Sequence, residues 1–303
     1  MPELPEVEVL VRHLAPQLRD RTIERVGILR RRSLVSISPA RFKRALCGSR
    51  IIDLTRRGKY LVFTLGRPGD GRTFPLLGHL GMTGRMYLQA PSVPLPRHAV
   101  AEFLLGATRF VFEDTRCFGR LTLDIAALAA LGPEPLSDDF TTAYFARELK
   151  RSAQPIKVKL LDQSLVAGVG NIYACESLFR ARLSPCLAAR RLTGRQTEAL
   201  LRSVRGTLAD AIEFGSGLLL DWAGAGPGVR DGLFYYGRAE GASGEGAERL
   251  LVYDRAGRPC HVCATPIRRM VQAGRSTFYC PRCQSTRGEA AGKTSVDGAG
   301  VDL

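Results

Sequence analysis

Four cysteines near the C-terminus restrict the fold of this chain more than any other feature. Two CxxC pairs, at 260–263 and 280–283, are separated by 16 residues. Pairs at this spacing supply four thiolates, which is the ligand set of a closed tetrahedral zinc site. A pair of disulfides is the alternative, and the lack of an export signal disfavours it. We predict one structural Zn²⁺, held by Cys260, Cys263, Cys280 and Cys283, that orders a finger too small for a core of its own.

The first eight residues form a second unusual stretch. Removal of Met1 would leave Pro2 with a free secondary amine. An amine beside a carboxylate can attack an aldehyde-like carbon and form an imine. Glu3 and Glu6 follow closely enough to move protons in such a reaction. Proline and glutamate also suit the first turn of a helix, so these residues alone leave both interpretations open.

The charge balance indicates a polyanionic partner. The chain has 44 Lys and Arg against 29 Asp and Glu, a net charge of +15 over 303 residues. Nucleic acid is the first candidate for such a partner, and an anionic membrane surface is the second. The sequence contains no apolar run of about 18 residues and no leader at its N-terminus. We therefore expect a cytoplasmic protein with no membrane partner.

Hydrophobic periodicity divides the chain into a β-rich and a helical part. Val7, Leu10, Val11 and Leu14 follow helical spacing and predict a helix that ends near Pro16. Short β-rich runs separated by Gly and Pro predict a sandwich or barrel after it. A Gly/Pro-rich linker then precedes helices, and the last 16 residues resemble a disordered tail. The predicted strands are 22–29, 51–55, 60–65, 99–105, 109–113 and 121–124; the predicted helices are 141–151, 156–163, 172–183 and 194–214.

Two glycine-containing segments are candidate phosphate contacts. Gly168-Val169-Gly170 precedes a predicted helix, so its backbone N–H groups can meet a phosphate, while Asn171 caps the helix or adds a donor. The alternative is an ordinary turn. Lys59 follows two arginines and a glycine at the start of a strand; such cations either protect a strand edge or aim at a phosphate near Pro2.

Three loop residues and one arginine of the finger complete the candidate set. Met82 and Phe118 stand on glycine-flanked turns. They are either core residues or wedges that enter the base stack, with Arg116 replacing a lost base partner. Arg275 lies between the cysteine pairs, on a basic finger suited to phosphate.

Taken together, these motifs resemble the formamidopyrimidine-DNA glycosylase family, which includes endonuclease VIII. The resemblance covers residues 1 to about 287 and rests on the N-terminal Pro-Glu segment, 57–61, 79–84, 131–139, 161–179 and the four cysteines. Leu4 favours the formamidopyrimidine branch.

The resemblance implies an α+β multidomain fold. It predicts an N-terminal β-sandwich with a leading helix, a helical helix–two-turn–helix domain and a C-terminal zinc finger. The corresponding boundaries are 1–131 for the catalytic domain, 132–140 for a linker, 141–249 for the DNA-binding domain with a lesion loop, 250–287 for the finger and 288–303 for the tail.

The resemblance also implies roles for individual residues. Pro2 would be the Schiff-base nucleophile at the deoxyribose C1′ and Glu3 the proton donor to the opened sugar. Lys59 would act in β-elimination, Arg275 in δ-elimination and phosphate contact, and Glu6 would organise the pocket. Met82, Arg116 and Phe118 would fill the void left by the flipped base, and His98, Lys157 and Asn171 would touch DNA or shape the site.

The implied activity is excision of oxidised purines, 8-oxoguanine and formamidopyrimidines, from double-stranded DNA by a monomeric glycosylase with AP lyase activity. Abasic sites would be substrates as well. Residues 215–222 and the Gly/Glu segment near 240–248 depart from the family pattern, and Cys117 replaces an expected arginine. These departures leave open a preference for oxidised pyrimidines or another lesion. Two alternatives of other classes are a damaged-DNA binding protein without turnover, which would need a blocked Pro2 or displaced carboxylates, and a zinc-ribbon RNA-binding protein, which would explain the charge and the four cysteines but not the Pro-Glu start.

Overall fold

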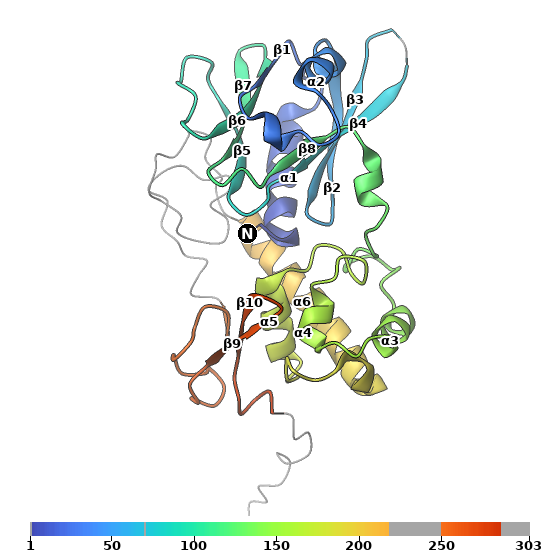
Figure 1. The fold of residues 1–303 in the computed structure, drawn as a ribbon, viewed down its shortest axis with the longest axis vertical. Helices are drawn as coiled ribbons and strands as arrows, with labels where there is room; N and C mark the ends of the chain where they lie inside the picture. The colour runs from blue at the N-terminus through green and yellow to red at the C-terminus, as the bar shows by residue number, and fades with distance from the viewer. Residues whose placement is uncertain (1, 70, 218–249, 286–303) are drawn as a thin grey trace, which may run out of the picture.

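The computed structural model describes residues 2–69, 71–217 and 250–285. They form a β-rich part and a helical part stacked along the long axis of the molecule, with the finger beside the helical part (Figure 1). The first helix, α1 (Leu4–Leu18), begins at the junction with the helices and runs into the β-rich part. The N-terminal residues therefore lie where the parts meet.

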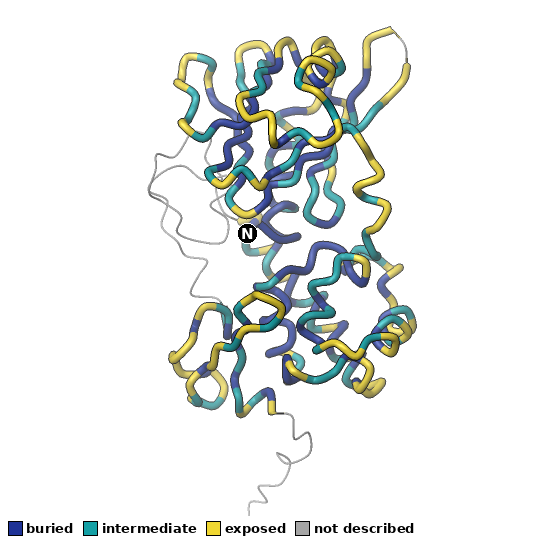
Figure 2. Tube along the Cα trace, viewed as in Figure 1, coloured by how far each residue is buried: buried dark blue, intermediate teal, exposed yellow. Residues whose placement is uncertain are grey.

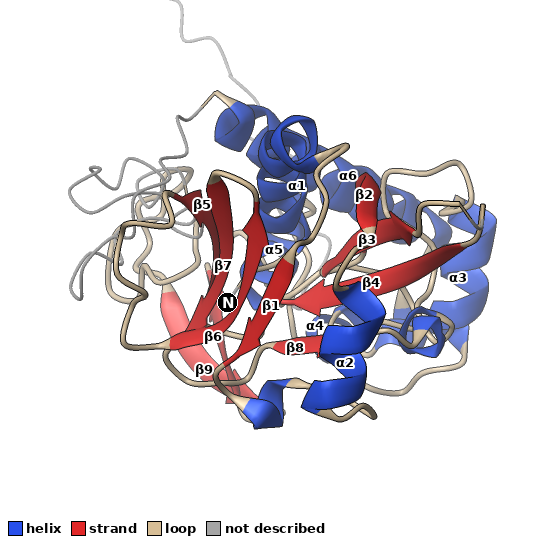
Figure 3. Cartoon of the chain, turned by 90° about the horizontal axis from the view of Figure 1, so that it is seen from above, coloured by secondary structure: helices blue, strands red, loops and turns tan. Residues whose placement is uncertain are grey.

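Two four-stranded antiparallel sheets build the N-terminal part. Figure 3 shows the two sheets as separate layers seen from above. One sheet has the order β1-β6-β7-β5 and the other β2-β3-β4-β8. Inward-facing apolar residues of both sheets share one core with α1, which confirms the predicted β-sandwich with a leading helix. The strands are β1 (Arg25–Ile28), β2 (Arg50–Arg57), β3 (Tyr60–Gly66), β4 (Thr73–His79), β5 (Gly84–Gln89), β6 (Ala99–Leu105), β7 (Thr108–Asp114) and β8 (Arg120–Thr122), with α2 at Pro39–Leu46.

Strands β4 and β5 were missed by the sequence prediction. Both contain or adjoin glycine, and β4 also carries Pro75, which is a poor residue for the middle of a sheet. In the structure β8 pairs only with Leu77 to His79 of β4. Pro75 therefore lies in the section of β4 that has a strand on one side only. A missing N–H donor is tolerated there.

Helix α1 is stabilised at its start by a capping box. The Glu3 side chain accepts from the backbone of Glu6, and the Glu6 side chain accepts from the backbone of Glu3. The helix continues past Pro16 to Leu18, two residues beyond the predicted end. In the last turn proline removes only one hydrogen bond, and the burial of Leu18 in the core favours the longer helix.

The helical part surrounds a second core. Figure 2 shows buried chain in the centre of each part and exposed chain around both. The 3₁₀ turns are Arg31–Ser33, Ile125–Leu128 and Ala189–Arg191. No helix in the described ranges is long and apolar enough to cross a membrane. The helices are α3 (Thr142–Lys150), α4 (Ile156–Leu160), α5 (Asn171–Arg180) and α6 (Gly194–Ser216), close to the predicted ranges.

The finger is a two-stranded antiparallel hairpin, β9 (Arg268–Gln272) and β10 (Arg275–Tyr279). Its apolar residues Val252 and Phe278 pack with Cys175 and Phe179 of α5. The predicted lesion loop from residue 218 on, the Gly/Glu segment near 240–248 and the predicted tail at 288–303 lie outside the described residues.

Candidate active site

Glu3 links the start of α1 to the start of α5. Its side chain is 1% exposed. One carboxylate oxygen accepts the N–H of Ile172 at 2.9 Å, and the other accepts the N–H of Tyr173 at 3.3 Å. A helix N-terminus favours a negative group because its first N–H donors lack intrahelical partners. The carboxylate next to Pro2 is therefore held by a helix from the other domain.

The Gly168-Val169-Gly170 turn makes this contact possible. A Cβ on Gly170 would lie 2.3 Å from Cδ of Glu3, and a Cβ on Gly168 would lie 2.6 Å from Leu4. Gly168 also has φ +85°, and its carbonyl accepts the N–H of Leu4 at 3.1 Å. The sequence suggested that N–H groups at this turn meet a phosphate, but two of those that follow it bind Glu3 instead.

Glu6 completes a pair of buried carboxylates beside Pro2, which is itself buried. Glu6 accepts the N–H of Glu3 at 2.8 Å and the hydroxyl of Tyr173 at 2.5 Å. Burial, and then the charge of Glu3, raise the pKa of Glu6 to about 7. Glu6 can therefore exchange a proton near neutral pH. Sequence reasoning missed Tyr173, whose apolar neighbours made it resemble a core residue.

Lys59, at the tip of the β2–β3 hairpin, lies close enough to these carboxylates for their charges to act on it. It lines a cavity of about 380 Å³ together with His79, Gln163, Gly170 and Arg275. Burial lowers the pKa of Lys59, and the charge of Arg275 acts in the same direction, whereas Glu3 and Glu6 oppose it. Lys59, Arg275 and the two glutamates thus share one electrostatic environment, although they come from three separate parts of the chain.

Two further cationic or polar residues connect the helices with the finger. Lys157 of α4 is fully buried, and its Nζ has no hydrogen-bond partner among the described residues. Burial lowers its pKa, and Arg275 adds to this effect. Asn171 does not cap α5; its side-chain amide donates to the carbonyl of Ser276 on β10 at 2.8 Å. This bond fixes the finger strand of Arg275 against α5.

The two glycine-flanked turns lie on the surface rather than in the core. Met82 is 38% and Phe118 47% exposed, so the core interpretation is wrong for both. The guanidinium of Arg116 lies 4.7 Å from the centre of the Phe118 ring. His98 lies next to the turn of Phe118, because its carbonyl accepts the N–H of Asp114 at 3.0 Å.

Asp114 organises both turns, and the sequence reasoning did not single it out. It is fully buried and accepts from the hydroxyl of Thr83 at 2.5 Å and from the N–H groups of Arg116 at 3.1 Å and Gly119 at 2.7 Å. An aspartate at a strand end, just before a glycine-containing turn, was the available signal. Its carboxylate holds the exposed side chains in place.

The four cysteines of the finger fit one structural Zn²⁺. Their sulfur atoms all lie within 4.8 Å of one another. The Cys263–Cys280 and Cys260–Cys283 separations are 3.5 and 3.9 Å. Tetrahedral zinc with Zn–S bonds of about 2.3 Å places sulfur atoms about 3.8 Å apart. The zinc prediction is therefore confirmed in both ligand type and geometry.

Comparison with known proteins gives one consistent result. Three family profiles match in order: the N-terminal domain of formamidopyrimidine-DNA glycosylase at residues 1–121, its H2TH domain at 131–221, and a zinc finger found in FPG and IleRS at 257–286. A protein of Thermus thermophilus named formamidopyrimidine-DNA glycosylase is 43% identical over 293 residues, which are 94% of this chain and 98% of that protein. One of Chloroflexus aurantiacus with the same name is 42% identical, with the same coverage of each chain.

Solved structures agree with the sequence relatives. The Lactococcus lactis protein in complex with Fapy-dG-containing DNA (a G226P mutant) has a TM-score of 0.81 at 30% identity, covering 94% of this chain and all of that one. The MutM protein of Thermus thermophilus has a TM-score of 0.77 at 40% identity, covering 93% and 98%. With three ordered domain matches and relatives above 40% identity along nearly its whole length, the chain belongs to the formamidopyrimidine-DNA glycosylase family.

Proposed function

We propose that this protein excises oxidised purines from double-stranded DNA through an imine on Pro2. As a member of its family it is a bifunctional base-excision repair enzyme, a DNA glycosylase with AP lyase activity. One observation carries the assignment of the nucleophile. Two buried, hydrogen-bonded carboxylates lie directly beside Pro2 and share their electrostatic environment with Lys59 and Arg275.

Pro2 is the nucleophile of this mechanism. Its secondary amine attacks C1′ of the damaged nucleotide, the N–C1′ bond forms, and the bond to the base breaks. Opening of the sugar yields an iminium, which is cationic without an added proton. The positive charge withdraws electrons from C2′ and acidifies its protons. Loss of the 3′ phosphate then follows base release at the same site.

The carboxylates have distinct tasks. Glu3, held by the N-terminus of α5, donates a proton to the sugar oxygen as the ring opens. Glu6 accepts hydrogen bonds from the N–H of Glu3 and the hydroxyl of Tyr173 and so organises the pocket. Because its pKa is near 7, it can take up and release a proton at neutral pH. Two neighbouring carboxylates in different environments suit separate proton-transfer roles.

Lys59 and Arg275 act on the elimination steps. The lowered pKa of Lys59 raises the fraction of neutral amine, which can accept a proton from C2′ in β-elimination. Arg275 contacts the phosphate that leaves and acts in δ-elimination. The exposed Met82, Arg116 and Phe118 occupy the space of the flipped base, because removal of a base leaves an unstacked gap in the duplex.

Further contacts and the organisation of the chain complete the proposal. His98, Lys157 and Asn171 touch DNA or shape the site. Zn²⁺ orders the finger that carries Arg275. The domain boundaries are 1–131, 132–140, 141–249, 250–287 and 288–303, and the protein acts as a monomer in the bacterial cytoplasm, associated with the nucleoid.

Borohydride trapping tests this function. The substrate is a short duplex with 8-oxoguanine opposite cytosine; an undamaged duplex and a Pro2→Gly variant are the controls. We expect a covalent adduct on the lesion duplex only, absent from the variant. An adduct on an abasic duplex but not on 8-oxoguanine would keep the lyase chemistry and reject the lesion assignment. Binding of the lesion duplex with no adduct on either substrate would reject catalysis.

A further inference from the structure

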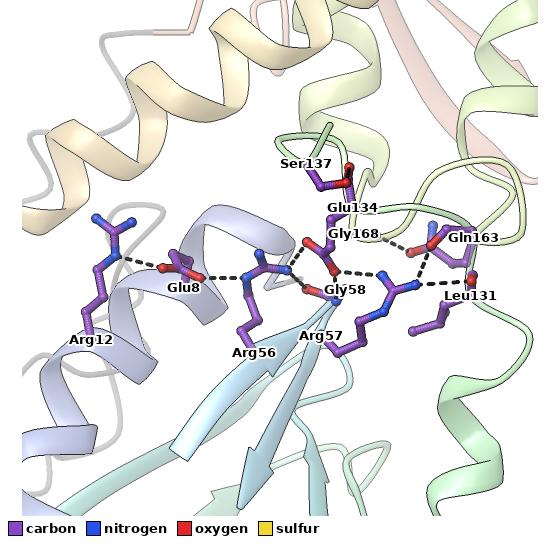
Figure 4. A network of polar contacts seen from close by, with 11 residues as sticks. Glu8, Arg12, Arg56, Arg57, Gly58, Leu131, Glu134, Ser137, Gln163 and Gly168 are labelled. Atoms are coloured by element: carbon purple, nitrogen blue, oxygen red, sulfur yellow. Dashed lines mark hydrogen bonds and ion pairs between the residues drawn. The ribbon is translucent and has the colours of Figure 1, made fainter. Parts of the chain in front are cut away.

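A single carboxylate outside the active-site cavity receives three donors from the hairpin of Lys59. Glu134 lies in the segment between the two parts of the chain. One of its oxygens accepts from Arg57 at 2.8 Å and from the backbone N–H of Gly58 at 2.6 Å, and the other accepts from Arg56 at 2.6 Å (Figure 4). Its contacts therefore converge on the residues directly before Lys59.

Both arginines make additional bonds that fix the hairpin. Arg56 donates to Glu8 of α1 at 2.7 Å. Arg57 donates to the carbonyls of Leu131 at 3.1 Å and Gly132 at 2.5 Å. The hairpin tip is thus bonded to α1 on one side and to the interdomain segment on the other. These bonds fix it against both parts of the molecule.

The interdomain segment is in turn bonded to the turn that holds Glu3. The N–H of Gly132 donates to the carbonyl of Gln163 at 2.8 Å, and the side chain of Gln163 accepts from Gly168 at 2.9 Å and donates to Val169 at 2.8 Å. Gln163 also lines the cavity of Lys59. An unbroken series of polar contacts therefore runs from Glu134 to the 168–170 turn.

The backbone before Lys59 has little freedom to choose another position. Gly58 has φ +56°, and a Cβ there would lie 3.3 Å from Leu131 and 3.5 Å from Ala167. The hairpin tip is packed against the interdomain segment as well as bonded to it. Gly58 directly precedes Lys59 and is bonded to Glu134. The position of Lys59 relative to Glu3 therefore depends on this bond.

We propose that Glu134 is a positioning residue that sets Lys59 in the active site. It acts through Arg56, Arg57 and the N–H of Gly58 and does not touch the substrate. This inference rests on the proposed function of Lys59. It also assigns the interdomain segment a role: the segment aligns a catalytic lysine of one domain with the carboxylate anchored by the other.

The chemistry of the contact requires a carboxylate. Glu134 offers two ionised oxygens to two guanidiniums and one N–H, and charge-assisted bonds of this kind are about twice as strong as neutral ones. A glutamine keeps the shape but has one oxygen and one NH₂ group. Whichever way it turns, its NH₂ group faces an arginine donor. The Glu134→Gln variant therefore loses part of the connection without a change in volume.

The test measures single-turnover strand cleavage on a duplex with a preformed abasic site. Glu134→Gln, Lys59→Ala and the double variant are compared with the wild type. Misplacement of a reacting group by about 1 Å costs up to about 100-fold in rate. Because Glu134→Gln removes only part of the connection, we expect it to slow cleavage by about tenfold in the wild-type background. In the Lys59→Ala background, where there is no lysine to misplace, we expect it to slow cleavage by less than about twofold.

Glu102→Gln is the matched control, because Glu102 is a half-buried glutamate paired with Arg109 in the other sheet. It should cleave at the wild-type rate. Arg57→Lys interrupts the same connection from the hairpin side and should reproduce the effect of Glu134→Gln. Thermal melting of every variant shows whether it is folded. If Glu134→Gln does not fold, Arg57→Lys tests the same connection.

Two results overturn the positioning role. One is wild-type cleavage by folded Glu134→Gln and Arg57→Lys while Lys59→Ala is slow. The other is an equal loss from Glu134→Gln in both backgrounds, which would mean that Glu134 does not act through Lys59. Wild-type cleavage by Lys59→Ala would instead refute the proposed function of Lys59, and the positioning role with it.

Discussion

Replacement of Gly170 by alanine tests whether the 168–170 turn holds the Glu3 carboxylate in place. The added Cβ would lie 2.3 Å from Cδ and 2.4 Å from Oε1 of Glu3. Ordinary contacts begin at 3.4 Å, so the carboxylate must move by about 1 Å (3.4 − 2.3). Because the atoms that clash are the far end of a side chain, the carboxylate yields and the backbone does not.

The displacement costs hydrogen bonds and alignment. The bonds that the N–H groups of Ile172 and Tyr173 donate to Glu3, at 2.9 and 3.3 Å, would lengthen beyond hydrogen-bond range. Two bonds to a charged group are worth about 3 kcal/mol or more, which corresponds to a melting temperature lower by about 6–12 °C. A shift of about 1 Å in a proton donor lowers the rate of base release by about 100-fold.

The assay pairs thermal melting with single-turnover release of 8-oxoguanine. Gly206→Ala is the control, because Gly206 lies inside α6 with no atom within 4 Å of an added Cβ. It should gain about 1 kcal/mol in stability from helix propensity and release base normally. If Gly170→Ala melted and reacted like the wild type, the argument that Glu3 depends on this turn would be refuted.

Three further predictions concern Glu6, the zinc finger and the exposed turn. Because the pKa of Glu6 rises from 4.5 to about 7 on folding, the unfolded chain loses this proton first as pH rises. The free energy of unfolding should therefore fall by up to about 3 kcal/mol between pH 4.5 and 7, and Glu6→Gln should remove this dependence in denaturation series. Cys280→Ser should lower zinc content and weaken DNA binding, measured by chelator-induced zinc release and by titration of a labelled duplex. Phe118→Ala should leave the melting temperature within about 1 °C, because the ring is exposed, and should lower base release.

Each of these three predictions would be contradicted by a specific result. An equal pH slope in wild type and Glu6→Gln would place the proton on another group. Wild-type affinity of zinc-free protein would separate the finger from DNA binding. Unchanged base release by Phe118→Ala would exclude the ring from base extrusion.

Several parts of this protein were predictable from residue order because their chemistry is local. The zinc ligands are two short CxxC segments, and thiolates at that spacing have few other uses. The helix from Leu4 follows from its 3.6-residue periodicity and the Glu3–Glu6 capping box. The short β-rich runs predicted a sandwich or a barrel, and the family resemblance implied the sandwich; β4 was not predicted, because Pro75 interrupts its pattern.

Other features depend on residues that are distant in the sequence. Asp114 and Tyr173 were not singled out from the sequence, yet Asp114 organises the exposed turns and the Tyr173 hydroxyl donates to Glu6. The 168–170 turn looked like a phosphate site, because nothing near it in the sequence shows that Glu3 occupies its donors. Only the contact of the first residues of α1 with the 168–170 turn in the folded chain decides which anion reaches them.

The sequence by itself determined which groups this protein can use: a proline amine, two glutamates, a lysine, an arginine on a finger and four thiolates. Tertiary structure alone decided how they meet. Glu3 is anchored by a helix that begins 168 residues later in the chain, and Gly58, the residue before Lys59, is bonded to Glu134, 76 residues away. The physical reason is that buried charges need partners, and in a folded chain those partners come from whichever segment the core brings alongside.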